Sequence, residues 1–264
     1  MSLALICGTG DLPARIAASQ DEAPMVCVLD GFAPKNLEAD VTFRLETIGS
    51  LLIQLGHEGI TEVCFCGAIE RPPLDPTVLD EHTRPLVPML AEALQSGDDG
   101  ALRAVAGLFE QTGFRVRGAH EISPDLVAPP GVLTNAWPDA QMRKDAQLGF
   151  DILQALAPFD VAQACVVGGG QLLGLETIAG TDALVSGLPD VPQIEHAVLV
   201  KGPKTGQDSR LDMPTLGPKT VSMVRKAGLR GIVVDAGDVI LLERETLVSE
   251  CDAAELVFWS RTGE

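Results

Sequence analysis

The first half of the chain alternates short apolar segments with segments of helical spacing, and this alternation constrains the fold more than any other feature. Residues 3–7 (Leu-Ala-Leu-Ile-Cys) and 25–29 (Met-Val-Cys-Val-Leu) are apolar at odd and even positions alike. A strand of this composition must be covered on both faces. Further strands are expected at 41–45 and 61–67, and helical spacing separates the strands. We therefore predict an α/β fold with a parallel sheet in this half of the chain.

A proline-rich stretch from Pro124 to Pro138 marks a boundary near the middle of the chain, because such a stretch cannot continue a helix. We place the boundary at the double proline, so that residues 1–130 form a first domain and residues 131–264 a second. The second domain begins with a predicted helix over 139–156. The short apolar strands that follow it predict a mixed α/β sheet.

The overall charge limits what the chain can bind. Its 264 residues carry a formal net charge of −18, which argues against nucleic acid and against loose docking on anionic lipid. The sequence contains no run of about 18 consecutive apolar residues, so we expect no transmembrane segment. The N-terminus lacks the basic region of a signal peptide, and we expect a cytoplasmic protein.

The cysteines and histidines do not form a metal-binding pattern. The six cysteines are spread widely, mostly within apolar runs. The closest pair, Cys64 and Cys66, is one residue short of a Cys-x-x-Cys motif. We predict reduced thiols in the core, and the dispersed histidines predict no His-rich metal centre.

Residues 201–220 concentrate charge among glycines and prolines, which shape loops. The charged residues of this loop are Lys201, Lys204, Asp208, Arg210, Asp212 and Lys219. Cations at this density suit a bound phosphate, and the carboxylates are suitable ligands for Mg²⁺. A strongly acidic chain needs such a local group of cations to bind an anion. The alternative is a solvated loop whose charges cancel.

Residues 8–13 (Gly-Thr-Gly-Asp-Leu-Pro) lie at the first predicted turn from a strand to a helix. Glycines let the backbone approach a ligand, and the helix N-terminus offers unpaired N–H groups to an anion. The segment nearly matches the dinucleotide fingerprint, with Asp30 lying 20 residues beyond Gly10 and Pro13 replacing the third glycine. A nucleotide site, an intact NAD site and a tight turn without a ligand all fit this pattern.

Other polar residues admit both a structural role and a ligand role. Arg71 follows the strand at 61–67, where it either binds phosphate or caps backbone carbonyls. Asp98 and Asp99 either cap the helix that follows them or contact a substrate. Asp182 is open to the same two interpretations.

Several segments, in order along nearly the whole chain, resemble one family. They are Ile-Cys-Gly-Thr-Gly-Asp-Leu-Pro at 6–13, Gly-Asp-Asp-Gly-Ala-Leu-Arg at 97–103, Gly-Ala-His-Glu at 118–121, Glu-x3-Gly-Thr-Asp at 176–182, and Lys-x2-Lys-x-Gly-Gln-Asp-x-Arg-x-Asp-x-Pro-Thr-x-Gly-Pro-x-Thr at 201–220. Together they resemble the UDP-2,3-diacylglucosamine pyrophosphatases of the LpxI type, which act in lipid A biosynthesis. The metallophosphoesterase type is excluded, because Asp80-Glu81-His82 is the only Asp-x-His and the Gly-Asn-His-Asp/Glu motif does not occur.

The resemblance implies a Rossmann-like first domain, a distinct second domain and a ligand cleft between them. It also implies Mg²⁺-dependent hydrolysis, with Mn²⁺ as a substitute, of UDP-2,3-diacylglucosamine to UMP and 2,3-diacylglucosamine 1-phosphate (lipid X). Water would attack the phosphorus that carries the sugar. The protein would make at most transient contact with the inner face of the inner membrane, and an oligomer is compatible with the sequence.

These implications, joined to the residue patterns, give a set of expected site residues. We expect Asp208 and Asp212 to bind the metal or orient water. The other expected contacts are Lys201, Lys204 and Arg210 to the diphosphate; Gly8, Gly10, Asp11, Leu12 and Arg71 to the nucleotide; and Asp98, Asp99, Thr181, Asp182, Gln207 and Thr215 to the rest of the substrate. An NAD-dependent oxidoreductase and a UDP-sugar-binding protein without activity are the alternatives.

Overall fold

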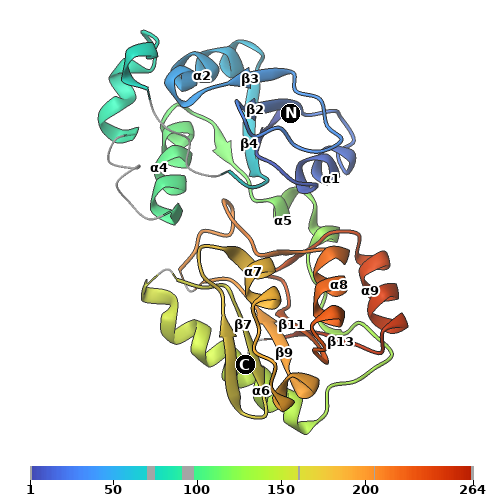
Figure 1. Cartoon of the computed structure of the whole chain (residues 1–264). Coiled ribbons are helices and arrows are strands. Elements are labelled where there is room, and N and C mark those ends of the chain that lie inside the picture. Colours follow the sequence, from blue (N-terminus) through green and yellow to red (C-terminus); the bar gives the residue numbers. More distant parts are fainter. Residues whose placement is uncertain (1, 70–74, 91–97, 160, 205, 263–264) are drawn as a thin grey trace. The chain divides into compact units, whose positions relative to one another are not determined.

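The structure is a computed structural model that describes residues 2–69, 75–90, 98–159, 161–204 and 206–262 (Figure 1). The chain divides into two compact units. The first unit contains Met1–Pro124 together with Asp208–Asp212, and the second contains Asp125–Gln207 and Met213–Glu264. Each unit has its own sheet and its own hydrophobic core.

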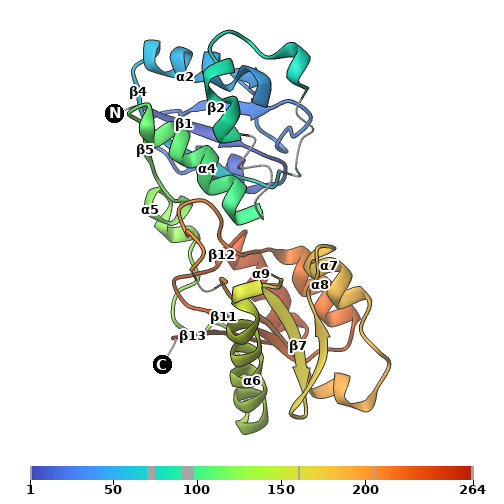
Figure 2. The same ribbon diagram turned by 90° about the vertical axis from the view of Figure 1, so that its left-hand side faces the viewer.

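The first unit is built on a five-stranded parallel sheet in the order β3-β2-β1-β4-β5 (Figure 2). Its strands are β1 (Ser2–Cys7), β2 (Met25–Leu29), β3 (Val41–Phe43), β4 (Ile60–Cys66) and β5 (Arg115–Val116). The parallel sheet predicted from the sequence is confirmed. The strand order reverses direction between β1 and β4, and sheets of this type bind ligands at the carboxyl ends of the strands beside such a point.

Helices cover both faces of this sheet. They are α1 (Leu12–Ala18), α2 (Ile48–His57), α4 (Asp98–Gln111) and α5 (Ala119–Ile122). Helix α1 links β1 outward to β2 and α2 links β3 back to β4, so right-handed crossovers place the two helices on opposite faces. Ala4 and Ile6 of β1 share a core with α2 and α4 that is centred on the fully buried Phe109. Leu5 and Cys7 alternate with them and face the other side.

The second unit contains a mixed six-stranded sheet in the order β6-β13-β11-β9-β7-β8. Strands β9, β11 and β13 run parallel, whereas β6, β7 and β8 pair with antiparallel neighbours. The bounds are β6 (Gly131–Val132), β7 (Ala164–Gly168), β8 (Gln171–Leu175), β9 (Val198–Lys201), β11 (Gly231–Asp235) and β13 (Val257–Arg261). A separate parallel pair consists of β10 (Thr215–Leu216) and β12 (Ile240–Leu241). The mixed sheet predicted for this half is confirmed.

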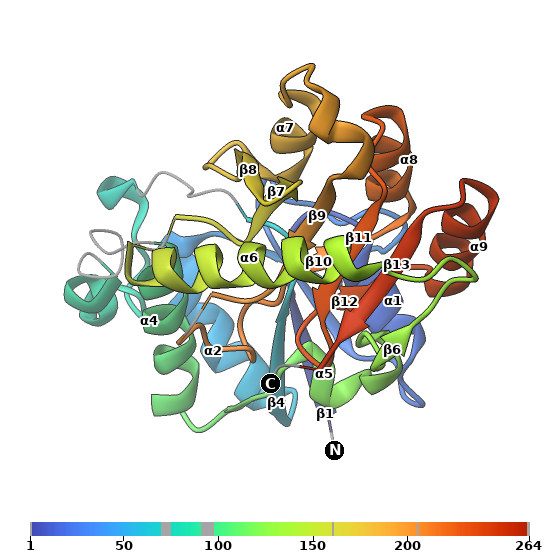
Figure 3. The same ribbon diagram turned by 90° about the horizontal axis from the view of Figure 1, so that it is seen from below.

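Helix α6 (Ala140–Leu156) covers one face of this sheet, and three shorter helices cover the other (Figure 3). These three are α7 (Gly180–Ser186), α8 (Pro218–Lys226) and α9 (Arg244–Ala253). Val200 of β9 packs with α6, whereas the neighbouring Leu199 packs with the opposite helices. Alternate strand residues therefore belong to two separate cores. None of the helices in the described part of the chain is both long enough and apolar enough to cross a membrane.

Short 3₁₀ turns connect several elements. They are η1 (Leu45–Thr47), η2 (Pro76–Val78), η3 (Arg84–Leu86), η4 (Pro124–Leu126), η5 (Ala157–Phe159) and η6 (Pro192–His196). The apolar spacing of residues 84–95 also predicts a helix. In the structure this segment begins with η3, and residues 91–95 lie outside the described part of the chain.

The apolar spacing of residues 215–227 predicts another helix, which begins later in the structure. Thr215 and Leu216 form β10, and α8 starts only at Pro218. Gly217 is extended and precedes the helix, and a proline is well suited to the first helical position because its missing N–H has no partner there. The prediction placed the start of this helix too early, because the helical spacing of the apolar residues also includes the short strand β10.

All six cysteines lie in described residues, are buried and are free thiols, which confirms the prediction. Burial raises the pKa of the Cys165 thiol to about 12, and that of Cys251 likewise.

Gly149 sets the distance between α6 and its sheet, and its replacement tests this packing. A Cβ at Gly149 would lie 2.7 Å from Val200 Cγ2 and 3.2 Å from Cys165 Sγ. Gly149→Ala should therefore lower the free energy of unfolding by about 1–3 kcal/mol, measured by urea denaturation. Gly107 of α4 is the matched control, because a Cβ there meets no atom within 4 Å. Gly107→Ala should stabilise the protein by about 0.5–1 kcal/mol. Equal effects of the two substitutions would contradict this account.

Candidate functional site

The turn after β1 is joined to the turn after β4, at the point where the strand order reverses. Thr9 and Ala68 exchange two backbone hydrogen bonds of 2.8 and 2.9 Å, and Gly8 N donates to Cys66 O at 2.8 Å. A Cβ at Gly8 would lie 2.4 Å from Ala68 O. The close backbone approach that the sequence predicted at Gly8 is thus an approach to the protein's own chain.

Gly10, Asp11 and Leu12 form the open part of this turn. Gly10 has φ of +103°, a conformation that favours glycine, and a Cβ there would meet no atom within 4 Å. Asp11 lies at the N-cap of α1 without capping it through its side chain, and its carboxylate is 3.6 Å from Lys35 Nζ instead. Leu12 then begins α1. The open space beside Gly10 is compatible with the nucleotide site expected from the sequence, which stays a prediction.

Residues 208–212 come from the second half of the sequence but belong to the first unit. The amides of Leu211 and Asp212 both donate to Asp208 O, at 2.9 and 3.2 Å, and close a single turn. Leu211 is buried in the same core as Phe109. The sequence assigned the whole loop 201–220 to the second domain, whereas burial of Leu211 and the ion pairs of Arg210 give its middle to the first unit.

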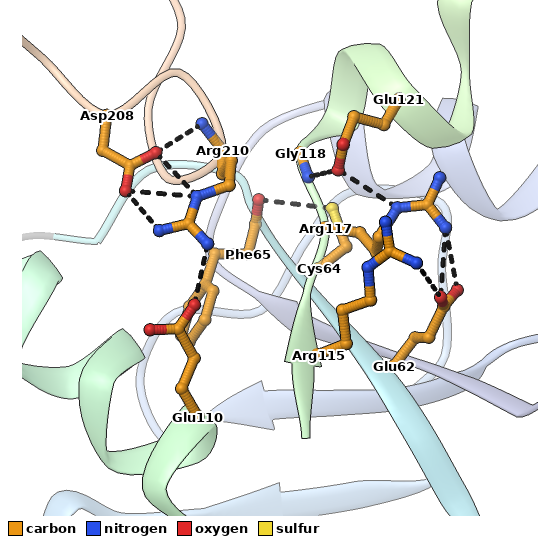
Figure 4. Close-up of polar contacts among 10 residues, drawn as sticks. All are labelled: Glu62, Cys64, Phe65, Glu110, Arg115, Arg117, Gly118, Glu121, Asp208 and Arg210. Atoms are coloured by element: carbon orange, nitrogen blue, oxygen red, sulfur yellow. Dashed lines mark hydrogen bonds and ion pairs between the residues drawn. The ribbon is translucent and has the colours of Figure 1, made fainter. Parts of the chain in front are cut away.

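Arg210 binds two carboxylates (Figure 4). Its Nε and Nη2 donate to Asp208 Oδ1 and Oδ2 at 3.0 and 2.7 Å, and its Nη1 donates to Glu110 Oε1 at 2.7 Å. The hydrogen bonds from Arg210 hold the pKa of Asp208 below its usual range, and the two carboxylates raise the pKa of Arg210. Asp208 is therefore ionised at neutral pH.

Asp208 and Asp212 fit a hard divalent cation by their donor chemistry. Both supply carboxylate oxygens, and they belong to the same hydrogen-bonded turn. Asp212 is an exposed residue, and Asp208 accepts hydrogen bonds on both oxygens from Arg210. A cation held here would share Asp208 with Arg210 and take its remaining ligands from water or substrate. Within the described residues, no three His, Cys, Asp or Glu side chains are grouped to hold a metal.

Lys201 lies in the second unit at the carboxyl end of β9 and is only 8% exposed. Its Nζ donates to Thr181 Oγ1 at 2.9 Å and to Thr215 O at 3.4 Å. Thr181 in turn donates to Glu176 Oε1 at 2.5 Å. The structure thus brings together three predicted residues, Lys201, Thr181 and Thr215, that are separated in the sequence.

The remaining predicted residues of the second unit make other contacts. Gln207 Oε1 accepts hydrogen bonds from Lys204 N at 3.2 Å and from Gln163 Nε2 at 3.4 Å. The Asp182 carboxylate pairs with Lys219 on an exposed part of the surface. The sequence offered a helix cap or a ligand contact for Asp182, and the structure adds this ion pair.

Two carboxylates that contact site residues were missed in the sequence. Glu176 lies five residues before Thr181 in one of the quoted segments, and this spacing was a usable signal. Glu110 is an exposed acid on α4 and carries no sequence signal. Arg71 lies outside the described residues. Asp98 and Asp99 form the first turn of α4, and their side chains are outside the described part.

These features define a two-domain α/β protein with a Rossmann-type strand order and a charged loop that supplies residues to both units. Residues 2–126 match the family model described as the LpxI N-terminal domain, and residues 129–259 match the LpxI C-terminal domain. The chain is 33% identical to the "UDP-2,3-diacylglucosamine pyrophosphatase LpxI" of Caulobacter vibrioides, over 95% of this chain and 94% of that protein. The chain belongs to the LpxI family, and the resemblance found in the sequence is confirmed.

The ion pair of Asp208 predicts a specific dependence of stability on pH. Because Arg210 lowers the pKa of Asp208 in the folded state, the pair contributes stability above the ordinary aspartate pKa of about 3.9. This contribution disappears as the pH falls through the lower, folded-state pKa. The loss of unfolding free energy caused by Asp208→Asn should therefore be largest at pH 7 and shrink toward pH 3, measured by urea denaturation.

The exposed pair of Asp182 and Lys219 provides the control for this measurement. Asp182→Asn should cost less than about 1 kcal/mol at pH 7, as is typical of exposed pairs. A loss caused by Asp208→Asn that stays constant from pH 7 to pH 3 would refute the assignment.

Proposed function

We propose that this chain hydrolyses the diphosphate of UDP-2,3-diacylglucosamine to UMP and 2,3-diacylglucosamine 1-phosphate, a step in lipid A biosynthesis. The observation that carries this proposal is the match of nearly the whole chain to a relative that bears the name of this activity. Membership of that family favours the pyrophosphatase over the oxidoreductase and over a binding protein without activity.

The first unit supplies the nucleotide end of the proposed site. Gly10 and the start of α1 lie at the carboxyl end of β1, beside the reversal of strand order, where sheets of this type bind nucleotides. The α1 N-terminus has no side-chain cap from Asp11, so the amides of Leu12 and Ala14 suit a phosphate, whereas Pro13 has no N–H to donate. We assign the UMP portion to this turn.

The loop 201–220 supplies the groups for the reaction. Lys201, Lys204 and Arg210 neutralise the diphosphate, and ionised Asp208 orients the attacking water or binds metal together with Asp212. Water adds to the phosphorus that carries the sugar, the bond from that phosphorus to the bridging oxygen breaks, and UMP leaves with the bridging oxygen. A bound Mg²⁺ or Mn²⁺ would polarise the phosphoryl oxygens and lower the pKa of the water.

The second unit offers apolar surface for the acyl chains. Val161 precedes β7 and is 43% exposed, and Ile178 follows β8 and is fully exposed. Both flank the end of the β7–β8 pair that holds Glu176, because Glu176 N donates to Ala164 O at 2.9 Å. Phe159 is also 72% exposed. We propose that these side chains contact the acyl chains of the substrate. The protein would then bind the acyl chains of individual substrate molecules.

Removing either aspartate from the 208–212 turn should abolish turnover and leave substrate affinity nearly unchanged. Carboxylates that hold a metal or orient water act mainly on the transition state. Asp208→Asn and Asp212→Asn should each lower kcat by at least about 100-fold, measured as release of UMP. Binding of UDP-2,3-diacylglucosamine is measured in parallel.

Asp21→Asn replaces an exposed acid of the same unit and serves as the matched control, with unchanged kcat. EDTA should stop turnover by the wild-type protein, and added Mg²⁺ or Mn²⁺ should restore it. Near-normal kcat in both folded variants would overturn the roles of the aspartates, and full activity in EDTA would remove the metal from the mechanism.

The acyl chains should contribute much of the catalytic efficiency. UDP-N-acetylglucosamine lacks these chains, so the binding energy that orients its diphosphate is smaller. Its kcat/KM should be at least about 100-fold lower than that of the diacylated substrate in detergent. Ile178→Ser should raise KM for the diacylated substrate alone, whereas Val78→Ser, at a 51% exposed position of the first unit, should not. Equal kcat/KM for the two substrates would show that the acyl chains are not recognised.

A further inference from the structure

Glu176 is a buried carboxylate for which the proposed reaction has no role so far. It follows β8 and is 9% exposed. Each of its carboxylate oxygens accepts a hydrogen bond: Oε2 from Gln163 N at 2.9 Å, and Oε1 from Thr181 Oγ1 at 2.5 Å. Its position is therefore fixed from two sides.

The directions of these hydrogen bonds follow from the groups involved. The ammonium of Lys201 can only donate, so the Thr181 hydroxyl accepts from Lys201 Nζ at 2.9 Å. The single proton of that hydroxyl is then directed at Glu176. Glu176 thereby holds Thr181 in the orientation that accepts from Lys201.

The backbone fixes the same three residues relative to one another. Ala164 of β7 pairs with Lys201 of β9, and Glu176 N donates to Ala164 O at 2.9 Å. Thr181 lies in the first turn of α7. The hydrogen-bonded series Glu176–Thr181–Lys201 thus connects the end of β8, the first turn of α7 and the end of β9.

Burial makes this chain of contacts energetically significant. An ammonium that is removed from water is costly unless hydrogen bonds and an opposite charge compensate it. Lys201 is 8% exposed, and Glu176 supplies a negative charge one hydroxyl away. Hydrogen bonds to charged groups are also stronger and more directional than neutral ones.

We infer that Glu176 is a positioning residue, which sets the place of the Lys201 ammonium through Thr181 so that Lys201 binds the diphosphate of the substrate. This inference rests on the proposed function. Because the charge of Lys201 attracts the diphosphate in the bound substrate and in the transition state alike, loss of positioning should raise KM more than it lowers kcat.

The test compares four single variants and one double variant by steady-state release of UMP and by the Kd for UDP-2,3-diacylglucosamine in EDTA. Glu176→Gln keeps the shape of the side chain and removes the charge, and Thr181→Val removes the hydroxyl. Each should raise KM and Kd by about 10- to 100-fold. Thr181→Ser keeps the hydroxyl and should stay within about threefold of the wild type.

Thr177→Val is the matched control, because Thr177 is an exposed threonine of the same connection, and its hydroxyl accepts a hydrogen bond from Ala179 N. It should leave KM and Kd unchanged. The double variant Glu176→Gln/Thr181→Val should be no worse than the poorer single variant, since both residues act through one series of hydrogen bonds.

A role of Glu176 in folding alone would lower the active fraction, and hence the apparent kcat, with KM unchanged. Wild-type Kd values for Glu176→Gln and for Thr181→Val would overturn the inference. If Glu176→Gln does not fold, the Kd of Thr181→Val decides, because valine is close to threonine in shape. A wild-type protein that binds the substrate without releasing UMP would contradict the proposed function, while the Kd values would still decide the inference.

Discussion

The ion pairs of Arg210 hold the segment on which the candidate chemistry depends. A planar guanidinium presents several donors in a fixed arrangement, so one side chain binds Asp208 with two nitrogens and Glu110 with a third. Lysine, with a single nitrogen, could not reproduce this geometry. Burial of Leu211 beside Arg210 adds a hydrophobic anchor to the same turn. Together these contacts place two aspartates from the second half of the sequence in the first unit.

Both units collect their polar groups at the carboxyl ends of parallel strands. In the first unit these ends carry the joined turns of Gly8 and Ala68. In the second, Lys201 ends β9 and Asp235 ends β11, on alternate positions of paired strands and therefore on opposite faces of the sheet. Asp235 binds Arg261 at 3.0 Å, and burial raises its pKa despite that partner. The Lys201 network thus belongs to the face covered by α7 and α8.

The sequence was sufficient where the signal was local. Strands with apolar residues on both faces, such as β1 and β2, were predicted nearly to the residue, because burial on both sides leaves a continuous pattern. The two-residue strand β10 was not predicted, since so short an element has no periodicity of its own. The place of residues 208–212 depends on a contact between Arg210 and Glu110, 100 residues apart, which no local pattern encodes. The sequence also located the turn at Gly8, but it did not show that the backbone there lies close to Ala68.

The charge balance of the site bears on the metal. Arg210 carries one positive charge and faces the two carboxylates of Asp208 and Glu110. These three side chains therefore have no positive charge in excess, in a chain whose formal net charge is −18. When the diphosphate is cleaved, further negative charge develops on the leaving UMP in the transition state. A divalent cation at Asp208 and Asp212 would stabilise that charge, which is a physical reason, independent of any relative, for proposing a metal-dependent reaction.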